Sequence, residues 1–424
     1  MNNKGIPIVF FAVLLLYCTV LLTYKLTFIG TETVLLSTLI WSVVFIKRFK
    51  TISVNSRQIL FLSFLFFAII ITYKLVGIST CGWEIVAGYA GWLMSCIFGI
   101  YSVAYSSYKQ TKRLLACILI VVLLNALYFI YSARGAKQIG FEFGAVVVTS
   151  ALFSTMFMLF SGVLLVLLLN SKNWSIKILS VAVIAVVLYL NFVVLQRGTN
   201  VILTVLMFGL ILVSASKINK IAYLSVLVIG VLMFLSVENG FYVDLLQWVE
   251  KEAAFSPRVA SRIHSILLYV KTGDYVYAGT SLKSRMILLT HSWDTFKSSY
   301  QNMLFGAGDH RTPGILILRS SNILIGNHFE LIDMLARYGI LFSAILYILL
   351  INHMKFIKEC FANSNSYRTL YHQSLILYLI YILRNIWGDA LASSTGIIMF
   401  IMLPCAIKLI VLENARAINE GRIV

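Results

Sequence analysis

The stretch "IPIVFFAVLLLYCTVLLTY", residues 6–24, contains no charged side chain. A helix of about 20 apolar residues is long enough to cross the hydrocarbon core of a bilayer. The stretch also lacks the small-residue site at which a secretory signal peptide is cleaved. It therefore predicts a retained membrane span and not a removed leader.

Similar apolar runs recur along the whole chain. The 424 residues are 60% hydrophobic and 12% charged, whereas soluble domains carry about 25% charged residues. About twelve runs are long enough to span a bilayer, and they start near Ile6, Thr33, Ile59, Ile85, Leu114, Gly144, Ile176, Val201, Ile221, Phe329, Leu370 and Thr395. The predicted fold is an all-α, polytopic integral membrane protein with about 12 transmembrane helices and one long helical outer loop.

The net charge of +18 is unevenly distributed. With the N-terminus inside the cell, most basic residues fall in the cytoplasmic segments, which hold only three acids, Glu359, Glu413 and Glu420. Such a bias is typical of the positive-inside rule. The charge therefore predicts topology, and it gives no reason to expect a nucleic-acid partner.

This topology predicts three regions. Residues 1–236 form a nine-helix transmembrane region, residues 237–327 an extracytoplasmic (periplasmic) helical loop, and residues 328–424 three C-terminal transmembrane helices. In the loop, Ser256 and Pro257 are typical of a helix start. A second loop helix is expected to carry an apolar face, made of Leu282, Met286, Leu289, Trp293 and Phe296, that lies on the membrane surface or over the spans. The expected location is the bacterial inner (cytoplasmic) membrane, with the loop on the outer side.

Neither metal nor cofactor is expected. The six cysteines are scattered without metal or redox spacing. His264, His291 and His310 of the loop also lack the spacing of a zinc site. No glycine-rich nucleotide loop and no acid pair typical of glycoside hydrolysis is evident. Asp389 follows Arg384 closely, and an ion pair between them is expected.

A first candidate site lies in "IGNHFELIDMLARYGI", residues 325–340. Asn327 and Glu330 have capping-box spacing, so a helix is expected to start at His328. The helix dipole there favours neutral imidazole, which can accept a proton from a hydroxyl, and the same helix end favours phosphate. A histidine at the membrane interface without a catalytic role fits the local pattern equally well. Asp333 and Arg337 have i,i+4 spacing and predict a structural ion pair.

Arginines supply the other candidates. Arg197 lies in a short outer turn, and Arg285 lies at the edge of the apolar face, from which it can turn inward. Arg258 and Arg262 are i,i+4 neighbours whose repulsion an anion would relieve. A guanidinium donates two hydrogen bonds to one phosphate. The alternative to phosphate binding is contact with a lipid headgroup or a surface ion pair. This alternative is favoured for Arg258 and Arg262, and it suits Arg197 least.

The order of these motifs resembles the O-antigen polymerase and O-antigen ligase superfamily of membrane glycosyltransferases. "QRGTN" (196–200), "SLKSRMILLTHSWDTFKSSYQNMLFGAG" (281–308) and "NHFELIDMLARYGI" (327–340) are similar to the family's arginine, Ser-Arg…Gly-x-Gly and histidine blocks. The motifs are short, and their order along the chain carries more weight than any one of them. Phe329 follows the histidine where ligases more often have a small polar residue, so the block favours a polymerase.

The resemblance implies polymerisation of undecaprenyl-diphosphate-linked oligosaccharides into O-antigen or capsular-type polysaccharide, by inverting, metal-independent transfer. Arg197 and Arg285, assisted by Arg258 and Arg262, would bind the donor diphosphate, and Arg285 would also act in catalysis. His328 would orient or deprotonate the acceptor hydroxyl. The alternatives are an O-antigen ligase that uses lipid A core as acceptor and, from another class, a flippase for the same lipid-linked sugar. A chain-length regulator stays open as a partner.

Overall fold

The computed structural model describes most of the chain. The described residues are 6–22, 54–80, 82–136, 143–191, 198–215, 239–252, 257–272, 279–310, 330–359, 367–386 and 393–419. Within these ranges every regular element is a helix and there is no strand. The predicted all-α class is confirmed for this part of the chain.

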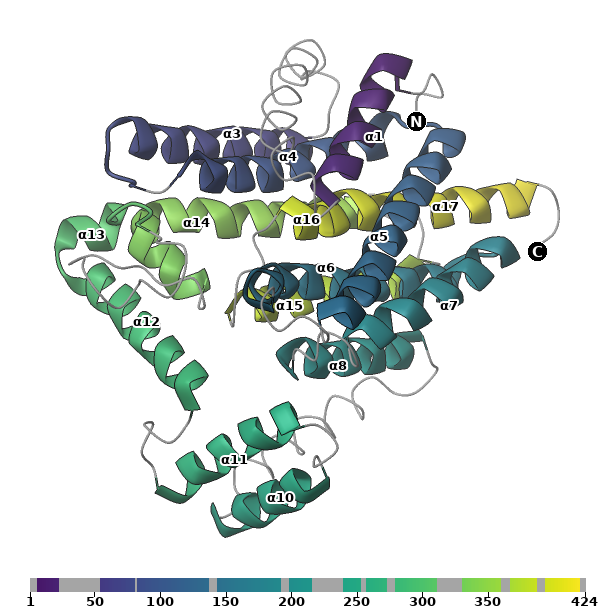
Figure 1. Cartoon of the computed structure of the whole chain (residues 1–424). Coiled ribbons are helices and arrows are strands. Elements are labelled where there is room, and N and C mark those ends of the chain that lie inside the picture. The colour runs from purple at the N-terminus through teal and green to yellow at the C-terminus, as the bar shows by residue number, and fades with distance from the viewer. Residues whose placement is uncertain are drawn as a thin grey trace.

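The helices of the bundle follow the predicted spans, with a short polar helix (Ser393–Gly396) before the last one (Figure 1). They are α1 (Ile8–Leu22), α3 (Val54–Leu75), α4 (Trp83–Tyr105), α5 (Tyr108–Ala136), α6 (Phe143–Asn170), α7 (Trp174–Tyr189), α8 (Gly198–Ala215), α14 (Glu330–Glu359), α15 (Arg368–Ile386), α16 (Ser393–Gly396), η7 (Ile397–Met402) and α17 (Leu403–Asn419). Among the described residues, six helical segments are long and apolar enough to cross a membrane, as a membrane-embedded protein requires. The spans expected near Thr33 and Ile221 lie outside the described residues, so the count of twelve stays a prediction.

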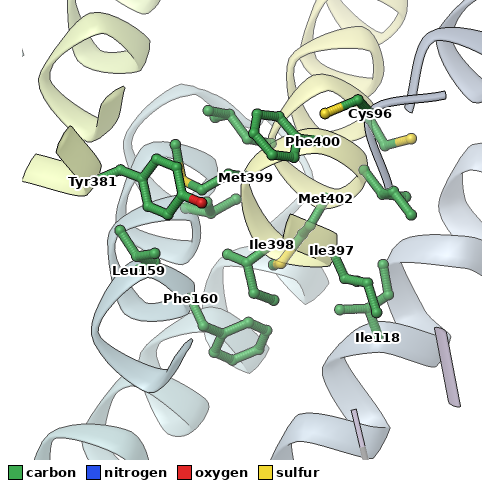
Figure 2. Packing of buried hydrophobic residues seen from close by; sticks show 14 of the residues in the cluster. Cys96, Ile118, Leu159, Phe160, Tyr381, Ile397, Ile398, Met399, Phe400 and Met402 are labelled. Atoms are coloured by element: carbon green, nitrogen blue, oxygen red, sulfur yellow. The ribbon is translucent and has the colours of Figure 1, made fainter. Parts of the chain in front are cut away.

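A π-helical turn, η7, occupies the centre of the core. All six of its residues, Ile397–Met402, are buried, and they pack against Cys96, Ile118, Phe160 and Tyr381 from four different helices (Figure 2). Trp92 of α4 donates a 2.6 Å hydrogen bond to the Tyr381 hydroxyl of α15. The core therefore holds α4, α5, α6 and α15 around the C-terminal span.

Several helix ends that carry basic residues meet at one end of the bundle, which we name the basic end. Lys408 of α17 donates to the Val103 carbonyl at the end of α4, at 2.8 Å. The Arg416 guanidinium lies 3.9 Å from the Tyr108 ring at the start of α5. Asn55, at the start of α3, donates to Glu359 at the end of α14. The end of α3 and the starts of α4 and α14 therefore lie at the opposite end.

The described part of the loop segment is helical except for residues 298–299 and 306–310, and its helices are α10 (Asn239–Glu252), α11 (Pro257–Thr272), α12 (Gly279–Lys297) and α13 (Tyr300–Phe305). The α10–α11 pair stands apart from the bundle, and α12 runs from it to α13 (Figure 1). The apolar face expected for α12 packs on the spans only in part. Trp293 is 42% exposed, whereas Leu288, Ser292 and Phe296 are buried. The helix is rotated because Ser292 turns inward to bind a carboxylate of α14.

Candidate functional site

The stretch that was expected to open a continuous span is bent. Gly339 has φ 65° and ψ −177°, so it divides α14 into a short piece, Glu330–Tyr338, and the span Ile340–Glu359 (Figure 1). Residues with a Cβ rarely adopt a positive φ, which explains why a glycine occupies this bend. The Ser343 hydroxyl donates a 2.9 Å bond to the Met334 carbonyl across the bend. The candidate catalytic block is therefore a separate short helix at the end of the bundle opposite the basic end.

Two glycines bring the loop backbone against this bend. Gly306 also has positive φ, and a Cβ there would overlap the backbone of Arg337 and Tyr338. A Cβ at Gly339 would overlap Leu304 and Phe305 in return. The Ala307 and Gly308 amides donate to the Ala336 and Arg337 carbonyls, both at 2.9 Å. The Gly-x-Gly segment thus binds the end of the short helix through backbone contact.

The same segment also holds the α3–α4 connection. Tyr73 donates to the Phe305 carbonyl at 2.5 Å. The Asp309 amide donates to the Ser79 hydroxyl at 2.8 Å, and the Thr80 amide donates to the Asp309 carbonyl at 3.1 Å. His310 contacts the Thr80 hydroxyl and the Ala307 carbonyl, at 2.9 and 2.8 Å. The loop is therefore attached to the first half of the chain as well as to the last.

Arg337 lies at the centre of this junction with a side chain that is 0% exposed. Its guanidinium lies 3.0 Å from Glu330, 3.8 Å from Asp309 and 3.9 Å from Asp333. It also donates a 2.8 Å bond to the Tyr89 hydroxyl of α4. We call these five residues the Arg337 cluster. Removing one partner of a buried ion pair costs about 3–5 kcal/mol, so the cluster is a strong clamp.

The cluster also fixes α12. The buried Ser292 hydroxyl donates a 2.6 Å bond to Asp333 Oδ1, and hydrogen bonds to charged groups contribute about 1.5–3 kcal/mol each. The structural pair predicted for Asp333 and Arg337 is confirmed, and it belongs to a larger network. Within the described ranges, no group of histidine, cysteine and carboxylate side chains has the arrangement of a metal site.

The sequence-predicted site residues surround this clamp but are only partly described. Arg197 and His328 lie outside the described residues. Arg258 and Arg262 belong to α11 and Arg285 to α12, while their side chains lie outside the description. Position 285 precedes Leu288 and Ser292 by three and seven residues, which places it on the α12 face that packs against α14. Glu330, the first residue of α14, is two residues from His328.

An apolar cavity opens beside Glu330. Its volume is about 80 Å³, and it lies between the two pieces of α14 and the outer part of α15. Leucine, isoleucine and methionine side chains form most of its wall, while Glu330, Tyr347 and Asn385 add polar groups. A cavity of this composition suits an apolar chain with a polar group at one end.

Sequence reasoning missed Asp309, Tyr89 and Ser292. Asp309 and Tyr89 are 28 and 248 residues away from Arg337, so no local spacing connects them. Ser292 is a polar residue between the apolar positions of α12, and its partner is 41 residues away. A buried arginine in a membrane protein needs several acceptors. That need is the one signal in the sequence that could have indicated partners of Arg337 other than Asp333.

Comparison with known proteins gives no match: no family model matches the chain, and no curated protein does. The similarity to the O-antigen polymerase and ligase superfamily therefore rests on the motifs quoted above. It is used below only as a proposal, together with the contacts that join those motifs.

Proposed function

We propose that this protein is a polysaccharide polymerase that joins lipid-linked oligosaccharide units at the outer face of the bacterial inner membrane. The observation that carries the proposal is the junction around Arg337. Through it, the helix with Arg285 and the Gly-x-Gly segment are bound to the short helix that follows His328. Two of the three motifs, residues 281–308 and 327–340, are thus neighbours in the fold where they are described, and this supports a common site for them.

In the proposed reaction, Arg197 and Arg285 bind the donor diphosphate, with Arg258 and Arg262 assisting. His328 accepts the proton of the acceptor hydroxyl while the hydroxyl oxygen forms a bond to the anomeric carbon. The bond from that carbon to the diphosphate oxygen breaks on the opposite face, and polyprenyl diphosphate leaves with the electron pair. The arginines stabilise the growing charge, and losing one such contact costs roughly 10²–10³ in rate.

The described residues support a positioning role for the junction. The Arg337 cluster is buried and holds Glu330, which supports a rigid base for the reactive groups that the proposal places beside it. The apolar cavity beside Glu330 suits the carrier lipid of the donor. Because basic ends face the cytoplasm in most membrane proteins, the opposite end, which holds this junction, would face outward.

The test begins with a strain that lacks the gene. If the protein is a polymerase, that strain accumulates single lipid-linked repeat units, which can be extracted as substrate. Purified protein in lipid vesicles should convert them to a polymer ladder without nucleotide sugar. His328→Ala and Arg285→Ala should lower the rate at least 10²-fold, whereas His291→Ala, at an exposed position of α12, should not.

Other outcomes would overturn the proposal. Full-length polymer stranded on the carrier lipid in the deletion strain would identify a ligase instead. A failure of the wild-type protein to extend extracted repeat units, or normal extension by His328→Ala, would remove the proposed chemistry.

A further inference from the structure

Four buried polar side chains form a hydrogen-bonded chain at the end of the bundle opposite the basic end. Arg384 Nε of α15 donates to Asn200 Oδ1 of α8 at 2.7 Å. Asn200 Nδ2 donates to the Ser154 hydroxyl of α6 at 2.8 Å, and this hydroxyl donates to Asn191 Oδ1 at 3.1 Å. Thr155 accepts from both Arg384 and Asn200. The chain therefore links α6, α8 and α15 to the end of α7.

Each bond of this chain has the same direction. It starts at a guanidinium, which is always charged, Asn200 and Ser154 each accept one bond and donate the next, and Asn191 accepts the last. Hydrogen bonds arranged in this way polarise and strengthen one another in a low-dielectric interior. Ser154, Asn191 and Asn200 are at most 1% exposed and Arg384 is 8% exposed. Such a set of polar groups is costly within a bundle unless it is fully engaged, and intramembrane charges commonly mark function.

The last residues of this hydrogen-bonded series show that it fixes the α7–α8 connection. Asn191 lies two residues after the end of α7 and Asn200 is the third residue of α8, so the two side chains flank the α7–α8 connection. Both bind the same Ser154 hydroxyl. One hydroxyl therefore holds the two ends of this connection together, and Arg384 holds Asn200 from the far side. Arg197 lies in that connection, three residues before Asn200.

We propose that Ser154, Asn200 and Arg384 are positioning residues that act on the donor diphosphate through Arg197. This inference rests on the proposed function, because it assigns Arg197 to diphosphate binding. The Ser154 hydroxyl is the central group. Removing it breaks its bonds to Asn191 and to Asn200 but leaves the bond between Arg384 and Asn200 in place.

The kinetic test compares Ser154→Ala with Ser161→Ala. Ser161 is equally buried, lies two turns along α6, and donates only within its own helix, to the Met158 carbonyl. Ser154→Ala should lower kcat/KM for extracted lipid-linked repeat units by roughly 10²-fold, the effect of a small misplacement, while Ser161→Ala should have little effect.

A double substitution separates positioning from loss of structure. If Ser154 acts through Arg197, then Ser154→Ala should cost little further activity once Arg197→Ala is present. Full additivity of the two losses would overturn the proposal, because it would mean that Ser154 acts elsewhere.

A second readout does not depend on the chemistry. Amide hydrogen exchange of the peptide that covers residues 192–199 should become several-fold faster in Ser154→Ala and stay unchanged in Ser161→Ala. Unchanged exchange in Ser154→Ala would overturn the positioning role. If exchange accelerates while wild-type protein fails to extend the repeat units, the anchoring of this connection is supported and the proposed function is the part that fails.

Discussion

Two buried arginines at the same end of the bundle are held in different ways. Arg337 lies among the carboxylates of Glu330, Asp309 and Asp333. The described acceptors of Arg384 are instead an amide and a hydroxyl, from Asn200 and Thr155. Removing one partner of a buried ion pair is costly, and the hydrogen bonds from the charged Arg384 guanidinium to neutral acceptors contribute about 1.5–3 kcal/mol each. Arg337 thus joins α4 and the loop to α14 through carboxylates and a hydroxyl, whereas Arg384 joins α15 to α6 and to the start of α8 through neutral groups.

The largest effect is expected from Arg337→Ala. It leaves three buried carboxylates without this guanidinium and should lower the free energy of unfolding by about 3–5 kcal/mol. Thermal unfolding of the purified protein in detergent would measure the loss. Arg368→Ala is the matched control, since Arg368 is exposed at the start of α15. If both variants unfolded at the wild-type temperature, Arg337 would not be a structural clamp.

The next effect tests whether the clamp depends on the bend in α14. Gly339→Ala forces a Cβ into a positive-φ position and into the backbone of Leu304 and Phe305. The strained conformation alone costs about 1–3 kcal/mol, so stability and repeat-unit extension should both fall. Gly88→Ala in α4, where an added Cβ meets open space, should be neutral or stabilising by up to about 1 kcal/mol. Similar behaviour of the two variants would mean that the bend is not required.

Much of the fold was predictable because apolar periodicity and run length are local properties. The runs that predicted spans became helices wherever they are described, and the i,i+4 spacing of Asp333 and Arg337 gave a real ion pair. The bend was not predictable, since a single glycine in an apolar run is compatible with a straight helix. Its positive φ follows from the close approach of Leu304 and Phe305, a contact that no local pattern contains.

The site was less predictable than the fold. Apolarity placed Trp293 on the face of α12 that was expected to meet the membrane surface or the spans, and it gave no reason to expect the polar Ser292 to be buried against Asp333. Arg384 was expected to pair with Asp389, which lies outside the described residues, and its described partners come from α6 and α8. Side-chain partners across a helical bundle depend on packing, so the roles of Arg197, Arg285 and His328 stay predictions.

The smallest effect on stability is expected when the acceptor types of the two arginines are exchanged, with a carboxylate placed beside Arg384 and an amide beside Arg337. This exchange also compares the two arginines most directly. Asn200→Asp keeps an acceptor for Arg384 Nε and adds an ion pair, but it removes the donor to Ser154. Stability should change by no more than about 1 kcal/mol, while kcat/KM should fall as in Ser154→Ala. The reverse exchange, Asp333→Asn, removes one carboxylate from the Arg337 cluster and should cost about 1.5–3 kcal/mol of stability. Equal losses of stability from the two exchanges, measured by thermal unfolding, would show that both arginines are clamps of the same kind.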